Sequence, residues 1–514
     1  MNMIRILATV SGLTMVSRIT GLIRETLMAR IFGASAETDA FFVAFRIPNL
    51  LRRLFGEGAF SQASVPILGE FKAQRSSAET KTLIDNVATV LVWSLLAVTV
   101  LGILGAPWVV WLLASGMQAS NTYDTAVLLT RIMFPYIFLI SLAAGAAGVL
   151  NTWKKFAIPA VTPVLLNLSF IVCALFLTPY VNPPVMALAI AVVLGGIAQL
   201  AVQVPALIRI GMLPRLTFNL RAALADPGVG RILRLMVPAT LSVSVAQISL
   251  IINTNIASHL APGSVSWITY ADRLMEFPTA LLGVALGTVL LPSLSEANAD
   301  GDANRYAELL DWGVRLSFLL ALPAAIGLWL LGTGLTATLF HYGLFTDHDV
   351  FMTRNAVIAY GVGLIGLILV KILAPGYYAK QDIRTPMKIA LIVLAVTQLL
   401  NLLFVPWFAH AGLALAIGLG ACLNAALLFI GLLRRGVYRP QPGWAVFLLR
   451  LLFALSIFGV ALWFMNQQFD WIALRAHPGA RVGWLALLIS TSALLYFLTL
   501  SATGMRLRDF KRKI

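Results

Sequence analysis

The sequence predicts an all-α polytopic membrane protein, and three observations lead to this fold class. Hydrophobic residues make up 60% of the 514 residues, charged residues make up 11%, and the mean hydropathy is +0.89. A soluble protein of this length could not bury so much apolar surface. The apolar residues fall in runs of about 20, which is the length that crosses a bilayer as a helix.

Fourteen runs of this kind, separated by proline, glycine and clusters of charge, are predicted to span the membrane. The first two and the eighth carry clusters of charged side chains, whereas the other spans hold fewer charged side chains or none. In chain order the predicted spans lie at residues 5–32, 36–64, 84–114, 124–150, 157–178, 183–208, 232–259, 266–295, 310–340, 351–377, 386–406, 411–434, 443–466 and 482–503.

The loops between these spans differ strongly in charge. If the N-terminus is cytoplasmic, the loops on that side hold nearly all of the loop Lys and Arg, including those of the C-terminal RLRDFKRKI. The opposite loops hold only Arg475 and Arg481. Since loops rich in Lys and Arg stay in the cytoplasm, both termini are predicted to lie there. The net charge of +16 thus reflects membrane topology, and nucleic acid is not expected as a partner.

Two pairs of segments indicate an internal repeat. AFSQASVPILGE (59–70) aligns with ALGTVLLPSLSE (285–296) at matching Ala, Pro, Leu and Glu positions. NTWKKFAIP (151–159) aligns less well with YYAKQDIRTP (377–386), and both place a basic loop before a proline that starts a helix. The sequence therefore predicts two bundles of six helices followed by two further helices.

The repeat divides the chain into three predicted parts. Residues 1–220 form an N-lobe, residues 221–440 form a C-lobe, and residues 441–514 hold the last two helices and a basic tail. Because six is an even number, both bundles cross the membrane in the same sense. In transporters with such parallel repeats, the substrate site lies between the two halves and alternating access comes from rocking them.

Arginines inside the predicted spans point to an anion site. A cation in hydrocarbon costs about 2.5–3.5 kcal/mol, so it is expected to face a water-filled cavity or a partner. In the first span, a helical wheel places Arg18 and Glu25 on one face and Ser17 and Arg24 on another. A guanidinium stays charged and offers a planar fork of donors that fits phosphate oxygens.

The second span continues this polar lining. One stripe of its helical wheel holds charged residues, and a neighbouring stripe adds an amide and another arginine. The charged stripe consists of Asp39, Arg46, Arg53 and Glu57. The neighbouring stripe consists of Asn49 and Arg52.

The eighth span supplies a counterpart in TYADRLMEFP, where Arg273 lies between Asp272 and Glu276. A carboxylate beside an arginine holds the guanidinium in place and can release it to a stronger anion. Such a pair can act as a gate. The alternative is that intramembrane cations only snorkel or pair for structural reasons, which is the interpretation favoured for the isolated Arg131, Arg354, Lys371 and Arg450.

No motif in the chain indicates an enzyme. The sequence contains no nucleophile elbow, P-loop or pair of Asp-rich motifs that would hold magnesium diphosphate. The five histidines lack metal-ligand spacing, and Cys173 and Cys422 lie far apart in apolar runs. We therefore expect no catalytic residue, metal, cofactor or disulfide.

Four segments of the sequence carry a family resemblance: MVSRITGLIRE, TDAFFVAFRIPNLLRRLFGEGAFSQASVPIL, SWITYADRLMEFPTALLGVALGTVLLPSLS and LAPGYYAKQDIRTPMKIA. They resemble the MurJ (MviN) family of lipid II flippases, within the multidrug/oligosaccharidyl-lipid/polysaccharide exporter superfamily. The likeness runs over nearly the whole chain. It implies fourteen helices, two lobes in a V around a cationic cavity, and a groove for a polyprenyl tail beside the last two helices.

The resemblance also implies a substrate and a location. Lipid II, the undecaprenyl-diphosphate-linked peptidoglycan precursor, would move from the cytoplasmic to the periplasmic leaflet of the bacterial inner membrane. Lipid II and membrane lipids are the implied partners, with cell-wall synthesis proteins as possible ones. Family functional positions map onto Arg18, Arg24, Asp39, Arg52, Arg273 and Glu276, and further onto Asn49, Glu57 and Asp272.

Some relatives bind sodium through an acidic group in the seventh helix, but residues 232–259 contain no Asp or Glu. The membrane potential or a proton is therefore the expected energy source. The alternative functions are a flippase for another polyprenyl-diphosphate glycan, a multidrug antiporter of the same fold, and a non-transporting scaffold of the cell-wall machinery. Arginines would disfavour a cationic drug in the cavity.

Overall fold

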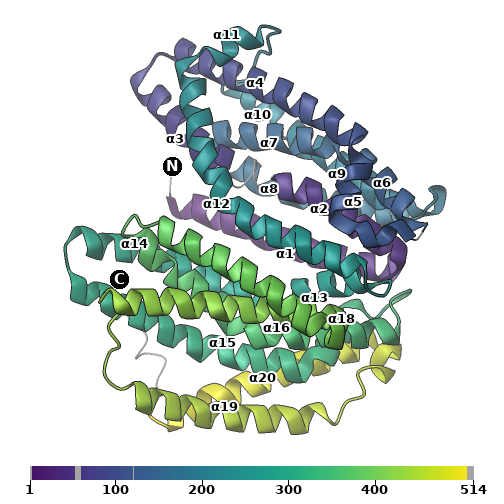
Figure 1. The fold of residues 1–514 in the computed structure, drawn as a ribbon, viewed down its shortest axis with the longest axis vertical. Coiled ribbons are helices and arrows are strands. Elements are labelled where there is room, and N and C mark those ends of the chain that lie inside the picture. The colour runs from purple at the N-terminus through teal and green to yellow at the C-terminus, as the bar shows by residue number, and fades with distance from the viewer. Residues whose placement is uncertain (1–2, 53–58, 120, 506–514) are drawn as a thin grey trace. The chain divides into compact units, whose positions relative to one another are not determined.

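A computed structural model of the chain describes residues 3–52, 59–119 and 121–505. Regular secondary structure in these ranges is entirely helical, which confirms the predicted all-α class. The chain divides into two compact units, Met1–Ser266 and Trp267–Ile514. Figure 1 follows the chain through the helices of both units.

The first unit contains the α-helices up to α12 and the beginning of α13. Their bounds are α1 (Met3–Phe32), α2 (Ala36–Arg52), α3 (Ala59–Gln74), α4 (Ser77–Leu104), α5 (Ala106–Ala114), α6 (Thr122–Met133), α7 (Pro135–Thr152), α8 (Ala157–Phe176), α9 (Met186–Ala201), α10 (Val204–Arg209), α11 (Leu220–Leu224), α12 (Pro227–Ser258) and α13 (Ser264–Pro278). Within this unit α8 packs between α1 and α9, and α2 packs on α6.

Helix α12 belongs to the first unit by its packing, because it lies against α3 and α5. The sequence repeat assigns the same residues to the second lobe, 221–440. Packing and sequence repetition are different criteria, so the division into lobes stays a prediction.

The second unit contains the rest of α13 and the helices after it. They are the π-helical segment η4 (Thr279–Val284), α14 (Ala285–Ala299), α15 (Ala303–Phe340), α16 (Asp347–Leu373), α17 (Pro375–Tyr378), α18 (Arg384–Arg434), α19 (Trp444–Asn466) and α20 (Pro478–Ala502). Helix α16 packs on α15 and α18, while α19 and α20 pack on each other and on α15 (Figure 1).

Small residues allow α16 and α18 to approach each other closely. A Cβ atom added to Gly363 of α16 would lie 2.1 Å from the Cα atom of Gly418 in α18. Lipid tails are as apolar as leucine, so helices in a bilayer associate through close packing rather than through the hydrophobic effect. A larger side chain at Gly363 would therefore separate α16 from α18.

Prolines interrupt several predicted spans. The spans at 124–150 and 183–208 are each split, with Pro135 beginning α7 and Pro205 in the first turn of α10. Proline removes a backbone donor and clashes with the preceding turn, so the helix breaks although the apolar run continues. The predicted spans 386–406 and 411–434 are the two helical parts of α18, which meet at a sharp non-helical turn at Ala409, where φ is 47° and ψ is −127°.

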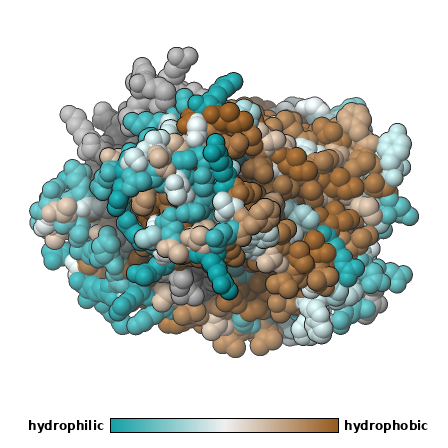
Figure 2. Space-filling view, turned by 90° about the horizontal axis from the view of Figure 1, so that it is seen from above, coloured by the Kyte–Doolittle hydropathy of each residue, from teal (hydrophilic) through white to brown (hydrophobic). Residues whose placement is uncertain are grey.

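Nine helices within the described residues are long and apolar enough to cross a membrane. The first, second, seventh and eighth predicted spans are not among them, so the count of fourteen stays a prediction. Figure 2 shows hydrophobic side chains gathered over a broad part of one face, beside a hydrophilic part. A hydrophobic region of this extent is typical of a surface in contact with lipid.

Candidate functional site

Arg24 of α1 contacts three side chains of the first unit. Its Nη1 donates a hydrogen bond of 3.0 Å to Oδ1 of Asn167, and its Nη2 pairs with the carboxylate of Glu25. Its guanidinium carbon lies 5.1 Å from the ring centre of Phe170. The Arg24 side chain is 16% exposed and that of Glu25 is 7% exposed. The guanidinium is thus held in place while part of it stays accessible.

Asn167 of α8 connects this arginine to the rest of α1. Its Nδ2 donates to the carbonyl oxygen of Ser17 at 3.0 Å and to Oγ1 of Thr20 at 3.1 Å. Ser17 and Arg24 were expected on one helix face; Asn167 contacts the backbone carbonyl of Ser17 and the side chain of Arg24. An amide in an apolar segment is costly unless it is hydrogen-bonded, so Asn167 is held firmly and orients Arg24.

Aromatic rings form the surface beneath the guanidinium. The Phe170 ring centre lies 6.1 Å from that of Phe41 and 6.0 Å from that of Phe45, both edge to face. A cation over such a ring gains about 0.5–2 kcal/mol, more when water is excluded. Chemically, this arrangement presents a fixed guanidinium to any anion that can compete with Glu25.

The other candidates of the first two spans lie elsewhere or are not described. Arg18 is exposed on α1 and makes no hydrogen bond or ion pair with the described part of the chain. Asn49 is half-buried on α2. Arg52 ends α2 and only its backbone is described, and Glu57 falls outside the described residues. The structure therefore brings Arg24 and Glu25 together without Arg18.

Asp39 of α2 caps the start of α13. Its carboxylate accepts hydrogen bonds from the backbone nitrogens of Gly263 and Ser266, both at 2.7 Å, and from Oγ of Ser266 at 2.5 Å. Asp39 is 4% exposed. The first backbone N–H groups of a helix lack partners inside the helix and carry partial positive charge, so they favour a carboxylate. Asp39 therefore connects the beginning of α2 to the beginning of α13 through neutral donors.

Arg273 and Glu276 form an ion pair on α13. Nη1 of Arg273 donates to Oε2 of Glu276 at 2.8 Å, and their side chains are 35% and 45% exposed. Asp272 is half-buried on the same helix. These residues belong to the second unit, whereas Arg24 belongs to the first.

A π-helical segment follows α13 directly, at Thr279–Val284. Single π turns inside helices occur often at functional sites. Here α16 approaches closely: a Cβ atom on Gly283 would lie 3.2 Å from Cγ of Lys371. The helix that carries Arg273 therefore changes its winding within a few residues of that side chain.

Sequence reasoning missed Asn167 and the π segment. A single amide inside the apolar run 157–176 was the available signal for Asn167, because such a group needs a partner in the membrane. For the π segment, Pro278 and Gly283 were the available signal. Among the described residues, no three or more His, Cys, Asp or Glu side chains are grouped as a metal site would require.

Similarity to known proteins extends along the whole chain. The family model described as "Lipid II flippase MurJ" matches residues 28–477. The chain is 57% identical over 514 residues to lipid II flippase MurJ of Burkholderia cenocepacia, with all of both chains covered. It is 40% identical to probable lipid II flippase MurJ of Vibrio cholerae, covering 98% of this chain and 96% of the relative.

Solved structures of membrane transporters also resemble this chain. A structure described as lipid II flippase MurJ in an inward closed conformation matches with a TM-score of 0.82 and 25% identity, covering 98% and 99% of the two chains. An inward-facing multidrug resistance MATE family transporter matches with a TM-score of 0.68 and 15% identity, covering 84% of this chain and 98% of that one, a likeness of fold alone. The chain belongs to the MurJ family of lipid II flippases.

Proposed function

We propose that this protein is a transporter that flips lipid II from the cytoplasmic to the periplasmic leaflet of the inner membrane by alternating access. It is a multi-pass membrane protein and not an enzyme. Family membership supports the substrate. The observation that carries the mechanism is Arg24, whose partly exposed guanidinium is oriented by Asn167 and compensated by Glu25.

In this proposal four arginines and the amide of Asn49 bind the diphosphate of lipid II. Arginine suits diphosphate because its donor fork matches two oxygens at once. The diphosphate, with more than one negative charge, displaces Glu25 from Arg24. The binding residues are Arg18, Arg24, Asn49, Arg52 and Arg273.

The acidic residues near these arginines act as gates. Glu25 and Glu276 hold their arginines when substrate is absent, and Asp39 holds α2 to the start of α13. We propose that these contacts open and close in turn as substrate binds and leaves. Glu57 and Asp272 complete the gating set.

The proposed architecture follows the sequence repeat. Residues 1–220 and 221–440 form the two lobes, and residues 441–514 supply a groove for the polyprenyl tail. Both termini lie in the cytoplasm, and contact with cell-wall synthesis proteins belongs to the proposal. The membrane potential or a proton supplies the energy.

Reconstitution of the purified full-length protein into vesicles containing labelled lipid II tests the function. We expect the protein alone to translocate lipid II, and to do so faster when the potential or a pH gradient is imposed singly. A polyprenyl-diphosphate carrying another glycan is the control substrate. Absence of lipid II movement would support a scaffold, and equal movement of both substrates would support a general glycan flippase.

A further inference from the structure

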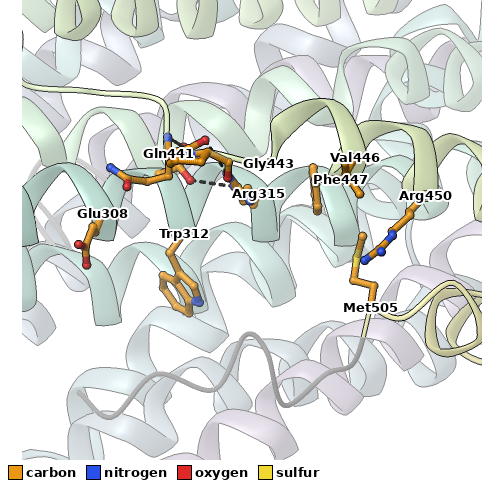
Figure 3. A pocket seen from close by; sticks show the side chains of 11 residues that line it. Glu308, Trp312, Arg315, Gln441, Gly443, Val446, Phe447, Arg450 and Met505 are labelled. Atoms are coloured by element: carbon orange, nitrogen blue, oxygen red, sulfur yellow. Dashed lines mark hydrogen bonds and ion pairs between the residues drawn. The ribbon is translucent and has the colours of Figure 1, made fainter.

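A pocket of about 660 Å³ lies in the second unit. It is lined by side chains of α15 and α19, by the loop between α18 and α19, and by Met505 beyond α20. Figure 3 shows Arg450 and Met505 at one end, Glu308 at the other, and Arg315 with Gln441 between them. Ligand sites typically have volumes of roughly 300–1,000 Å³.

One wall of the pocket is rigidly built around Asp311. This carboxylate is 3% exposed and accepts hydrogen bonds from the Tyr438 hydroxyl at 2.8 Å and from Nε1 of Trp444 at 2.7 Å. Nε of Arg315 lies 2.8 Å from its second oxygen. The negative charge of Asp311 is thus already compensated by the surrounding protein.

Arg315 is positioned by the same loop. Its Nη2 donates to the carbonyl oxygens of Gln441 and Pro442, both at 2.9 Å, and its guanidinium lies 5.0 Å from the ring centre of Trp444. Nη1 makes no hydrogen bond within the described part of the chain. Arg315 therefore keeps one donor group for a ligand.

Arg450 of α19 contributes a second positive charge. It makes no ion pair or hydrogen bond with any residue that the structure describes. A Cβ atom on Gly504 would lie 3.7 Å from both of its Nη atoms, which places the guanidinium beside the C-terminal end of α20. The partial negative charge of a helix C-terminus stabilises a cation there but does not neutralise it.

The surroundings match the edge of a bilayer. Leu449, Leu452 and Phe453 flank Arg450 on α19 and are 69%, 57% and 56% exposed. Trp312 lines the pocket, and tryptophan is enriched where membrane meets water. The charge bias of the loops predicts that this end of α19 faces the cytoplasm.

We propose that this pocket binds the headgroup of an anionic phospholipid of the cytoplasmic leaflet, with its phosphate at Arg450 and Arg315. Basic pockets between membrane helices on the cytoplasmic side suit such headgroups. The exposed apolar side chains beside Arg450 receive the start of the acyl chains. This site goes beyond the proposed function, because it takes a resident lipid rather than the transported one.

Native mass spectrometry of the full-length protein with phosphatidylglycerol tests the proposal. Arg450→Gln should weaken the tightest phosphatidylglycerol site by roughly ten-fold, since it removes a charge-assisted hydrogen bond. Arg439→Gln is the matched control, because Arg439 is exposed on the same loop and does not line the pocket. Equal weakening by both variants would overturn the proposal in favour of general surface charge.

Three further comparisons sharpen the test. Phosphatidylethanolamine, which is zwitterionic, should bind this site more weakly than phosphatidylglycerol; equal or tighter binding would assign a zwitterionic ligand and overturn the proposal. Inorganic phosphate at millimolar concentration should not displace the lipid. Added lipid II should not displace phosphatidylglycerol from this site, and displacement would place the pocket on the substrate path instead.

Discussion

Arg24 and Arg481 both lie on helices of this membrane protein, but their side chains have different partners and different exposure. Arg24 pairs with a carboxylate and stays 16% exposed. Arg481, in the first turn of α20, is fully buried and meets no carboxylate among the described residues. Its Nη atoms donate to Nδ1 and the carbonyl oxygen of His341, both at 3.3 Å, and to the carbonyl oxygen of Trp471 at 3.4 Å.

The difference separates a charge available to a ligand from a charge used for structure. Glu25 can be exchanged for another anion, because a carboxylate and a phosphate make the same kind of bond to a guanidinium. Neutral acceptors fixed in the backbone cannot be exchanged in this way. Arg24 is therefore suited to binding and Arg481 to holding the 341–347 loop against α20.

The largest expected effect comes from removing the Arg24 charge. Arg24→Gln should lower lipid II translocation by roughly ten- to hundred-fold, since it removes charge-assisted bonds of about 1.5–3 kcal/mol. It also removes the ion pair of the buried Glu25, which destabilises the protein. The double variant Arg24→Gln with Glu25→Gln should recover thermal stability but not translocation. Recovery of both would show that Arg24 serves structure alone.

Removing the Arg481 side chain should lower stability without changing translocation. Arg481→Met leaves the carbonyl groups of His341 and Trp471 without donors, at a cost of about 1–3 kcal/mol for each buried group. We expect a lower midpoint of thermal unfolding and unchanged translocation per folded molecule. A normal midpoint combined with lost translocation would remove the distinction between the two arginines.

A smaller effect is expected from Asn167. Asn167→Ala keeps the Arg24 charge but loses its orienting hydrogen bond, worth about 0.5–1.5 kcal/mol. Translocation should fall by roughly three- to ten-fold, mostly through weaker substrate binding. Thr162→Ala, on the same helix and outside the Arg24 cluster, is the control. If Asn167→Ala were neutral, the carboxylate and the aromatic ring would suffice to place Arg24.

The smallest effect concerns the pH dependence of the Arg481 region. Burial lowers the pKa of His341 below its usual 6.5, against the opposing effect of the hydrogen bond that its Nε2 donates to Asp347, and nearby Arg475 and Arg481 lower the pKa further. The unfolded chain therefore takes up the proton first, so this contribution to stability is complete above pH 6.5 and declines as the pH falls below it. Thermal unfolding should show this decline, and His341→Gln should reduce it. An unchanged decline would assign it to another group.

The sequence alone determined where most helices lie. Residues 443–466 and 482–503 were predicted as spans, and α19 and α20 occupy Trp444–Asn466 and Pro478–Ala502. Each apolar run is long enough to cross a bilayer and cannot be hidden otherwise, so local composition suffices. The shared helix face of Ser17 and Arg24 also followed from helical periodicity.

Only the tertiary structure decided what each charged side chain meets. Asn167 lies 143 positions from Arg24 in sequence, and the donors that bind Asp39 are backbone groups 224 and 227 positions away. Arg481 was expected in a loop, but α20 begins at Pro478 and buries it. Backbone donors have no sequence signature, and helix periodicity orients a side chain without selecting the helix that packs against it. The chemistry of each arginine is therefore set by the packing of the helices.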